Sequence, residues 1–344
     1  MNKDKPFITV MVLCYNYGHL LRRALDAVAA QDFNDYELLF IDNGSIDNSK
    51  EVFEVFCKDH PEVNTRYMHV CPNQGPCHGW NLGIKEARGE YVLFNDADDW
   101  MEPNCLSVLA NAAKESGADR VTGQYMEVLP DGKVSRVRHL VANSNSKIVT
   151  PMLQGSIYRR SIILNNKIEL PENVFGPYDF FLTFKFADCE KNKPVFVTTN
   201  VYNYLINPNS ICRITEKELS SDYTIETVYQ KAVKPFIDIA TDCVREGMDN
   251  DLKDQECYLI VRNSYASVFS LFKSHPYEIA DGVFKKTRNE LEKIFKNYRC
   301  NRFINPIGNG FEFPGSVAVW FMVVGEESFV LKLAFKLINR VFVK

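Results

Sequence analysis

Three carboxylates directly follow an apolar segment in the first third of the chain. Residues 91–94 (YVLF) are apolar, and Asp96, Asp98 and Asp99 come immediately after them. Side chains two positions apart in an extended segment point to the same side, so Asp96 and Asp98 are expected to face one way. A divalent cation relieves the repulsion between such carboxylates, and oxygen ligands suit Mg²⁺ or Mn²⁺, which commonly bridge to phosphates. The pattern predicts a metal and diphosphate site, with an acidic turn after a strand as the competing interpretation.

The elements that would position these carboxylates alternate between strand and helix patterns. Apolar, β-rich segments predict strands over residues 7–13, 36–41, 65–70, 90–95 and 120–127. Amphipathic segments between them predict helices over residues 19–31, about 47–58, 76–87 and 103–116. This alternation predicts an α/β fold with a mostly parallel sheet flanked by helices.

Ligands of such sheets bind beyond the carboxyl ends of the strands, near the point where the strand order reverses. Tyr15, Asn16, Asp42 and the Asp96–Asp98 cluster each follow an apolar segment. We therefore expect all of them at one edge of the sheet.

Three glycines four residues apart require a separate interpretation. Gly75, Gly79 and Gly83 fit neither a dinucleotide-binding motif nor a P-loop. On a helix, that spacing makes a smooth face for close packing, so Gly79 and Gly83 are predicted to be structural. Asn81 lies between them and is either a ligand contact or a surface amide.

Composition limits the classes of function. The chain has 344 residues, which suggests about two domains, and a net charge of −4, which argues against nucleic-acid binding. The ten cysteines form no paired C-x-x-C motifs, so zinc is not expected and reduced thiols are. No signal-peptide pattern and no segment long enough to span a membrane are evident, which predicts a cytoplasmic protein.

Four ordered segments resemble family 2 glycosyltransferases of the GT-A fold. They are ITVMVLCYN, ELLFIDNGSIDNS, NQGPCHGWNLGIKEARGE and YVLFNDADDW. The resemblance is strong over residues 7 to about 127 and weaker to about 213. It implies a Rossmann-like sheet and an inverting transfer of a sugar from a nucleotide-diphosphate sugar, expected to be UDP-linked, with Mn²⁺ or Mg²⁺ as cofactor.

The same resemblance implies roles for individual residues in donor binding. Tyr15 resembles the aromatic residue that stacks on the base, and Asp42 resembles the acid that hydrogen-bonds to the base. Asp96 resembles the acid near the ribose and diphosphate, and Asp98 resembles the direct metal ligand, with Asp96 as a second candidate. Asn16 and Asn81 complete the predicted donor-binding set.

The catalytic base is less clearly marked. Family members begin a helix with a Glu-Asp pair whose aspartate deprotonates the acceptor hydroxyl, and Tyr178-Asp179 stands at the matching position here. We predict Asp179 as this base and Glu172 as the reserve candidate. In another alignment Pro177 takes the base position and Asp179 is only a helix cap.

Other positions also depart from the pattern of the family. Leu13 stands where proline or threonine is common, Asn43 replaces an aspartate, and Trp80 replaces a frequent arginine, which removes one contact to the diphosphate or the acceptor. Asn207 stands near a frequent histidine, which argues against a histidine metal ligand. The motif of processive members is not found, so single additions are expected.

Four regions are predicted along the chain. Residues 1–127 form the nucleotide-sugar half of the GT-A domain, 128–213 the acceptor half, 214–315 a helical C-terminal domain, and 316–344 an apolar and basic tail. Arg159 and Arg160, with Arg136, Arg138 and His139, are interpreted as solvated charges or as contacts to an acidic acceptor.

The tail repeats a basic residue every fourth position at Lys332, Lys336, Arg340 and Lys344. A basic stripe on an apolar helix suits an anionic membrane, so peripheral membrane contact through residues 328–344 is predicted. Packing on the domain or on a second subunit of a homo-oligomer is the alternative.

Together these observations predict a metal-dependent glycosyltransferase that adds single sugars to a glycan or lipid-linked acceptor in surface polysaccharide synthesis. Two alternatives are a non-catalytic sugar-nucleotide-binding or scaffold subunit and a sugar-nucleotide pyrophosphorylase. The pyrophosphorylase is disfavoured because residues 9–23 lack its glycine-rich signature.

Overall fold

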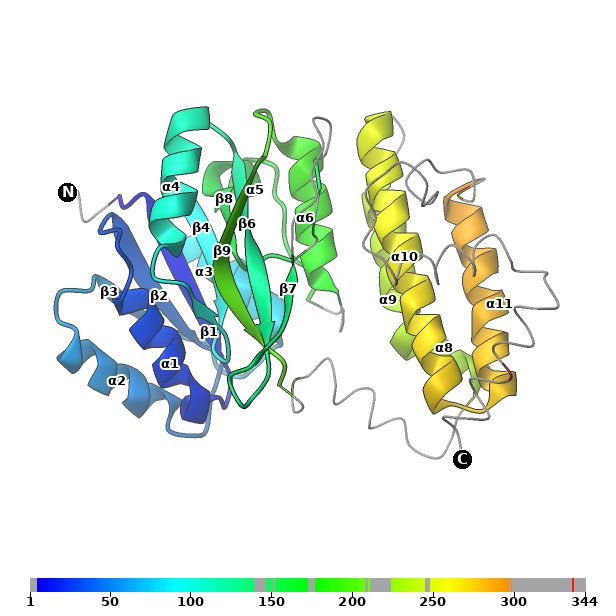
Figure 1. The fold of residues 1–344 in the computed structure, drawn as a ribbon, viewed down its shortest axis with the longest axis horizontal. Helices are drawn as coiled ribbons and strands as arrows, with labels where there is room; N and C mark the ends of the chain where they lie inside the picture. Colours follow the sequence, from blue (N-terminus) through cyan, green and yellow to red (C-terminus); the bar gives the residue numbers. More distant parts are fainter. Residues whose placement is uncertain are drawn as a thin grey trace. The chain divides into compact units, whose positions relative to one another are not determined.

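The computed structural model describes most of the chain in two compact units. The described residues are 5–138, 147–148, 150, 152–172, 177–207, 210, 224–244, 248–296, 298 and 336. The first unit comprises residues 1–174 and 178–207, and the second comprises residues 175–177 and 208–344. Figure 1 shows a sheet with helices in the first unit and a set of helices in the second.

The first unit is built on one nine-stranded sheet. Its strands are β1 (Ile8–Cys14), β2 (Tyr36–Asp42), β3 (Thr65–His69), β4 (Tyr91–Asp96), β5 (Trp100–Met101), β6 (Arg120–Val128), β7 (Val134–Arg138), β8 (Ser156–Arg159) and β9 (Val195–Leu205). The order is β3-β2-β1-β4-β8-β6-β9-β5, and β7 pairs with β6. The first four strands in this order are parallel, and β6 and β9 are parallel to each other. The predicted mostly parallel α/β sheet is confirmed.

The strand order reverses between β1 and β4. The chain runs outward from β1 to β2 and β3, and then returns to place β4 on the other side of β1. At such a switch point the two connections diverge, and their loops leave a crevice at the carboxyl ends of the strands.

Two hydrophobic cores cover the two faces of this sheet. Val10 and Val12 of β1 belong to one core, and Met11 and Leu13 belong to the other, because successive strand side chains alternate between faces. Helices α1 (Gly18–Ala29), α2 (Ser49–Asp59) and α4 (Cys105–Ser116) contribute to the first core, and α3 (Pro76–Glu86), α5 (Arg160–Asn165) and α6 (Tyr178–Cys189) contribute to the second. Burial on both faces explains why these strands are continuously apolar.

Helix α3 lies close against β1 and β2 because of its glycines. A Cβ on Gly79 would lie 2.6 Å from Leu13 Cδ1, and one on Gly83 would lie 2.4 Å from Ile41 Cδ1. Such distances leave no room for a side chain. The predicted structural role of Gly79 and Gly83 is confirmed.

The described part of the second unit is helical, as predicted. Its helices are α8 (Ile225–Ala232), α9 (Lys234–Cys243), α10 (Asn250–Ser274) and α11 (Tyr277–Ile294). The side chain of Asp249 caps α10 by accepting a hydrogen bond from Leu252 N at 2.9 Å. Within the described residues, no helix has the length and apolar character needed to cross a bilayer. The predicted tail lies outside the described residues apart from Lys336, whose ammonium lies 5.5 Å from the centre of the Tyr277 ring.

Candidate functional site

The predicted donor-site residues lie at neighbouring strand ends. Cys14 pairs with Asp42 in the register of β1 and β2, and Leu13 pairs with Asp96 in the register of β1 and β4. Tyr15 and Asn16 follow β1 directly. The carboxyl ends of three adjacent parallel strands therefore bring Tyr15, Asn16, Asp42 and Asp96 to one edge, at the switch point.

Asp99 anchors the acidic turn from inside the protein. Its side chain is buried, Oδ1 accepts a hydrogen bond from Leu205 N at 2.7 Å, and Oδ2 accepts one from the Tyr202 hydroxyl at 3.1 Å. The Tyr202 hydroxyl also accepts a hydrogen bond from Asp96 N at 3.3 Å. These bonds fix the turn to β9, as expected for a structural residue.

Asp96 and Asp98 are held by residues from distant parts of the chain. Gln154 Nε2 donates to Asp96 Oδ2 at 2.6 Å, and Asn207 Nδ2 donates to Asp98 Oδ2 at 3.3 Å. Arg23 Nη2 donates to the Asp98 carbonyl at 2.7 Å, and its guanidinium lies 3.8 Å from the centre of the Trp100 ring. The turn is thus set in place before any ligand arrives.

Burial and mutual repulsion make the acidic turn electrostatically unfavourable. Burial, together with the charge of Asp98, raises the pKa of Asp96 to about 7. Burial raises the pKa of Asp98 as well, and burial with its two acidic neighbours raises the pKa of Asp99. A bound cation would stabilise the ionised carboxylates that this environment disfavours.

The donor atoms here suit a hard divalent cation. Asp96 and Asp98 supply carboxylate oxygens, and Asn207 beside Asp98 also carries a side-chain oxygen. Two carboxylates are enough for Mg²⁺ or Mn²⁺ when water and substrate phosphate complete the coordination. No group of three or more His, Cys, Asp or Glu residues suited to a metal is found in the described part of the chain. The residues therefore fit an ion that is shared with a diphosphate.

The residues around the predicted base-binding position are also preorganised. Asn16 adopts a positive φ of 58°, its backbone N–H donates to Ser45 Oγ at 3.0 Å, and its side-chain oxygen accepts from Ile46 N at 2.8 Å. Asn16 thus connects the loops that follow β1 and β2. Tyr15 remains 42% exposed, which leaves its ring accessible for stacking.

Asn81 makes its contacts within the protein. It is buried, its Nδ2 donates to the Leu170 carbonyl at 2.8 Å, and its Oδ1 accepts from Leu170 N at 2.8 Å. The side chain thus joins α3 to the segment after α5. Asn81 is therefore buried and is not a surface amide, and its role as a ligand contact stays a prediction.

Asp179 and Glu172 differ sharply in environment. Asp179 lies in the first turn of α6, and its Oδ1 is buried without a hydrogen-bond partner among the described residues. Burial, with the charge of Asp96, raises the pKa of Asp179 to about 8. Glu172 is exposed, and the hydrogen bond to Oε1 from His78 Nδ1 at 2.9 Å lowers its pKa. Only Asp179 has the raised proton affinity expected of a general base.

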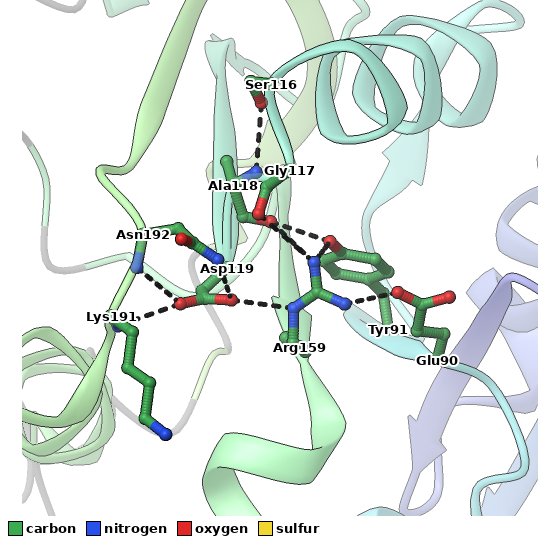
Figure 2. Close-up of polar contacts among 9 residues, drawn as sticks. All are labelled: Glu90, Tyr91, Ser116, Gly117, Ala118, Asp119, Arg159, Lys191 and Asn192. Carbon is green, nitrogen blue, oxygen red and sulfur yellow. Dashed lines mark hydrogen bonds and ion pairs between the residues drawn. The ribbon is translucent and has the colours of Figure 1, made fainter.

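Arg159 and Arg160 are structural, neither solvated charges nor available acceptor contacts. Figure 2 shows the Arg159 guanidinium between Asp119, Glu90 and the Tyr91 ring, with Nε 2.7 Å from Asp119 Oδ1. Arg160 donates to the carbonyls of Ile84 and Lys85 at 2.7 and 2.6 Å, at the C-terminal end of α3. Arg159 ends β8, which is antiparallel to β4, so this cluster lies at the sheet edge opposite the acidic turn. The sequence interpretation of these two residues was wrong because paired arginines look the same in sequence as free ones.

Several residues around the site were missed by the sequence analysis. They are Arg23, Tyr17, Gln154 and Tyr202. Gln154 and Tyr202 reach Asp96 and Asp99 from 58 and 103 positions away, so no local spacing reveals them. Only the strand pairing brings them together.

Comparison with known proteins identifies the family. The profile of "Glycosyl transferase family 2" matches residues 9–189. The chain is 27% identical to "Glycosyltransferase GlyG" of Streptococcus pneumoniae over 70% of this chain and 82% of that protein. It is also 27% identical to "Poly(ribitol-phosphate) beta-N-acetylglucosaminyltransferase TarS" of Staphylococcus aureus, over 72% of this chain but only 42% of TarS.

Solved structures agree on the fold. A TarS fragment in complex with UDP-GlcNAc superposes with a TM-score of 0.61 at 19% identity, over 85% of this chain and 91% of the fragment. A mannosyltransferase from Pyrobaculum calidifontis, in complex with GDP-Man and Mn²⁺, gives a TM-score of 0.55 at 15% identity, over 95% and 88% of the two chains. The fold is of the GT-A type. The chain belongs to glycosyltransferase family 2 and is a glycosyltransferase, which confirms the predicted family and enzyme class.

Proposed function

We propose that this glycosyltransferase transfers a single sugar from a UDP-linked donor to a glycan acceptor, with Mn²⁺ or Mg²⁺ bound. The main support for the proposal is that Asp42, Asp96 and Asp98 lie at neighbouring strand ends beside an exposed Tyr15, at the switch point of the sheet. An accessible ring with acids on two flanking strands is what a nucleotide diphosphate and its metal require. The bound UDP-GlcNAc of TarS and the bound Mn²⁺ of the mannosyltransferase support a donor and ion of this kind.

Asp98, together with Asp96, would hold the divalent ion. When bound there, the ion supplies positive charge that neutralises the leaving diphosphate. Gln154 and Asn207 keep the carboxylates of Asp96 and Asp98 oriented, so little side-chain freedom is lost when donor binds.

Asp179 is proposed to take the proton from the acceptor hydroxyl. A general base works best when its pKa lies near the working pH, and burial places the pKa of Asp179 at about 8. Its Oδ1 is buried and has no hydrogen-bond partner among the described residues, so its capacity to accept a hydrogen bond is unmet in this structure. One such displacement inverts the anomeric carbon, in keeping with the inverting chemistry that the family resemblance implies.

The acceptor is proposed to be a surface glycan or a lipid-linked precursor. GlyG, TarS and "Putative glycosyltransferase EpsH" of Bacillus subtilis are relatives, and the name of TarS specifies poly(ribitol-phosphate) as its acceptor. A cytoplasmic location, peripheral membrane contact through residues 328–344 and a homo-oligomer stay predictions.

Calorimetric titration of UDP in the presence of Mn²⁺ tests the donor site. We expect binding by the wild-type protein that Mn²⁺ strengthens, and loss of the Mn²⁺ effect in Asp98→Ala. Asp26→Ala, which removes a surface acid paired with Arg22 on α1, is the matched control and should leave the titration unchanged. Equal Mn²⁺ dependence in Asp98→Ala would remove Asp98 from the metal site.

A further inference from the structure

A pair of opposite charges is buried where α6 ends. Arg120, the first residue of β6, is 2% exposed, and its Nη2 lies 3.0 Å from Oε1 of Glu190, the residue that follows α6. The Glu190 side chain is also 2% exposed. Arg120 Nη2 donates to the carbonyl of Lys147 as well, whereas Arg120 Nε and Glu190 Oε2 have no hydrogen-bond partner among the described residues. The pair is therefore removed from water with only part of its hydrogen bonding replaced.

Such a pair is a poor means of stabilising a fold. Removing two charges from water costs about as much as their attraction returns, and apolar side chains of similar size often fill the same space with no loss of stability. The cost is evident here, because burial raises the pKa of Glu190 to about 7 despite the neighbouring guanidinium. A directional ion pair does fix the register between the two elements that carry it, whereas apolar contacts tolerate small shifts.

The pair lies at one end of a stripe on α6 that begins at the proposed catalytic base. The residues of this stripe are spaced by four, three and four positions, which places them along one side of a helix. They are Asp179, Thr183, Phe186 and Glu190. The Tyr158 hydroxyl of β8 lies 3.5 Å from Thr183 Oγ1, and the centres of the Tyr158 and Phe186 rings are 5.1 Å apart. The register of β6 and β8 places Tyr158 opposite Arg120. The sheet thus contacts the same side of α6 that carries Asp179.

We propose that Arg120 and Glu190 set the rotation and register of α6 on the sheet, and so act as positioning residues for Asp179. This inference rests on the proposed function, in which Asp179 is the base. A helix moves nearly as a rigid rod, so a rotation of about 20° displaces a group about 6 Å from the helix axis by about 2 Å. A displacement of about 1 Å at a reacting group can lower a rate about 100-fold. Loss of the pair should therefore be seen in turnover rather than in donor binding.

The test replaces both charges together, because a single apolar replacement would leave the other charge buried and unpaired. Arg120→Met/Glu190→Leu should unfold in urea at or above the midpoint of wild type, and should bind UDP with Mn²⁺ within about twofold of wild type. Its release of UDP from the UDP-sugar that wild type turns over should fall at least about tenfold. Arg22→Met/Asp59→Leu is the matched control, since it removes a 2.7 Å ion pair between α1 and α2 and should leave turnover and UDP binding unchanged.

Glu190→Gln should give the opposite combination. The amide has the same length and keeps an oxygen for Arg120 Nη2, so we expect turnover within about threefold of wild type. The buried guanidinium loses its counter-ion, so the urea midpoint should fall. If the pair served stability alone, turnover would follow the urea midpoint in both variants.

The outcomes separate this inference from the proposed function. Undiminished turnover in Arg120→Met/Glu190→Leu would overturn the positioning role and leave the proposed function intact. A lowered urea midpoint or a failure to fold in this variant would also overturn it, because the pair would then be structural. Hydrogen exchange gives an answer without turnover: the amides of residues 178–189 should exchange faster in this variant, and equal exchange would contradict the inference. No turnover of any sugar nucleotide by wild type would overturn the proposed function itself.

Discussion

Replacing Asp119 with asparagine should destabilise the first unit in a pH-dependent way. Asp119 directly precedes β6 in the chain. Its side chain is buried and accepts four hydrogen bonds (Figure 2). Oδ2 accepts from the backbone N–H groups of Lys191 and Asn192 at 2.9 and 2.8 Å, and Oδ1 accepts from Arg159 Nε at 2.7 Å and Asn192 Nδ2 at 3.2 Å. An amide keeps one oxygen and turns its NH₂ toward one pair of donors. Because hydrogen bonds to charged groups are worth about 1.5–3 kcal/mol, the expected loss is about 2–4 kcal/mol at pH 7.

The sign of the pH dependence follows from the lowered pKa of Asp119. Burial opposes this shift, but the hydrogen bonds from Asn192, Lys191 and Arg159 hold the folded pKa below the unfolded value of about 3.9. The stabilisation is therefore present above pH about 4 and is lost as pH falls through the folded pKa. Asp119→Asn should thus cost most near pH 7 and progressively less below pH 4.

Urea denaturation of wild type and Asp119→Asn at pH 7, 5 and 3.5 measures this difference. Asp131→Asn is the control, because Asp131 also has a lowered pKa but lies in an exposed turn beside Lys133, so its loss should change the unfolding midpoint little. A cost below about 0.5 kcal/mol for Asp119→Asn at pH 7 would refute the reasoning. So would a cost that stays constant down to pH 3.5.

Three further variants test the packing and support of the site. Gln154→Ala should weaken Mn²⁺-dependent UDP binding about tenfold, because Asp96 loses its 2.6 Å hydrogen bond; unchanged affinity by calorimetry would contradict this. Tyr202→Phe should lower the free energy of unfolding by about 1–3 kcal/mol, since the buried Asp99 carboxylate loses a donor; a urea midpoint equal to that of wild type would argue against it. Gly83→Ala should cost about 1–3 kcal/mol because its Cβ would lie 2.4 Å from Ile41 Cδ1, and a stabilised variant in the same assay would show that α3 can move away.

Patterns within short stretches of sequence predicted the fold well. Continuous apolar strands such as β1 and β2, separated by amphipathic helices, already imply a parallel sheet buried on both faces. The ends of such strands must meet at one edge, so Asp42 and Asp96 could be expected together before any coordinates were known. The spacing of Gly79 and Gly83 likewise predicted a smooth helix face, because that requirement is local.

Contacts that depend on distant pairing could not be predicted in this way. Gln154 reaches Asp96 only because β8 inserts between β4 and β6, antiparallel to both. The pairing of Arg159 could not be predicted for the same reason, since its acidic partners Glu90 and Asp119 come from the segments before β4 and β6.

The most direct test of the central claim is transfer chemistry with a panel of sugar nucleotides. Release of UDP from UDP-sugars in the presence of Mn²⁺ should be detectable for wild-type protein. It should fall about 10²–10⁴-fold in Asp179→Asn, while UDP affinity stays unchanged. No turnover of any sugar nucleotide by wild type, or full turnover by Asp179→Asn, would contradict a transferase that uses Asp179 as its base.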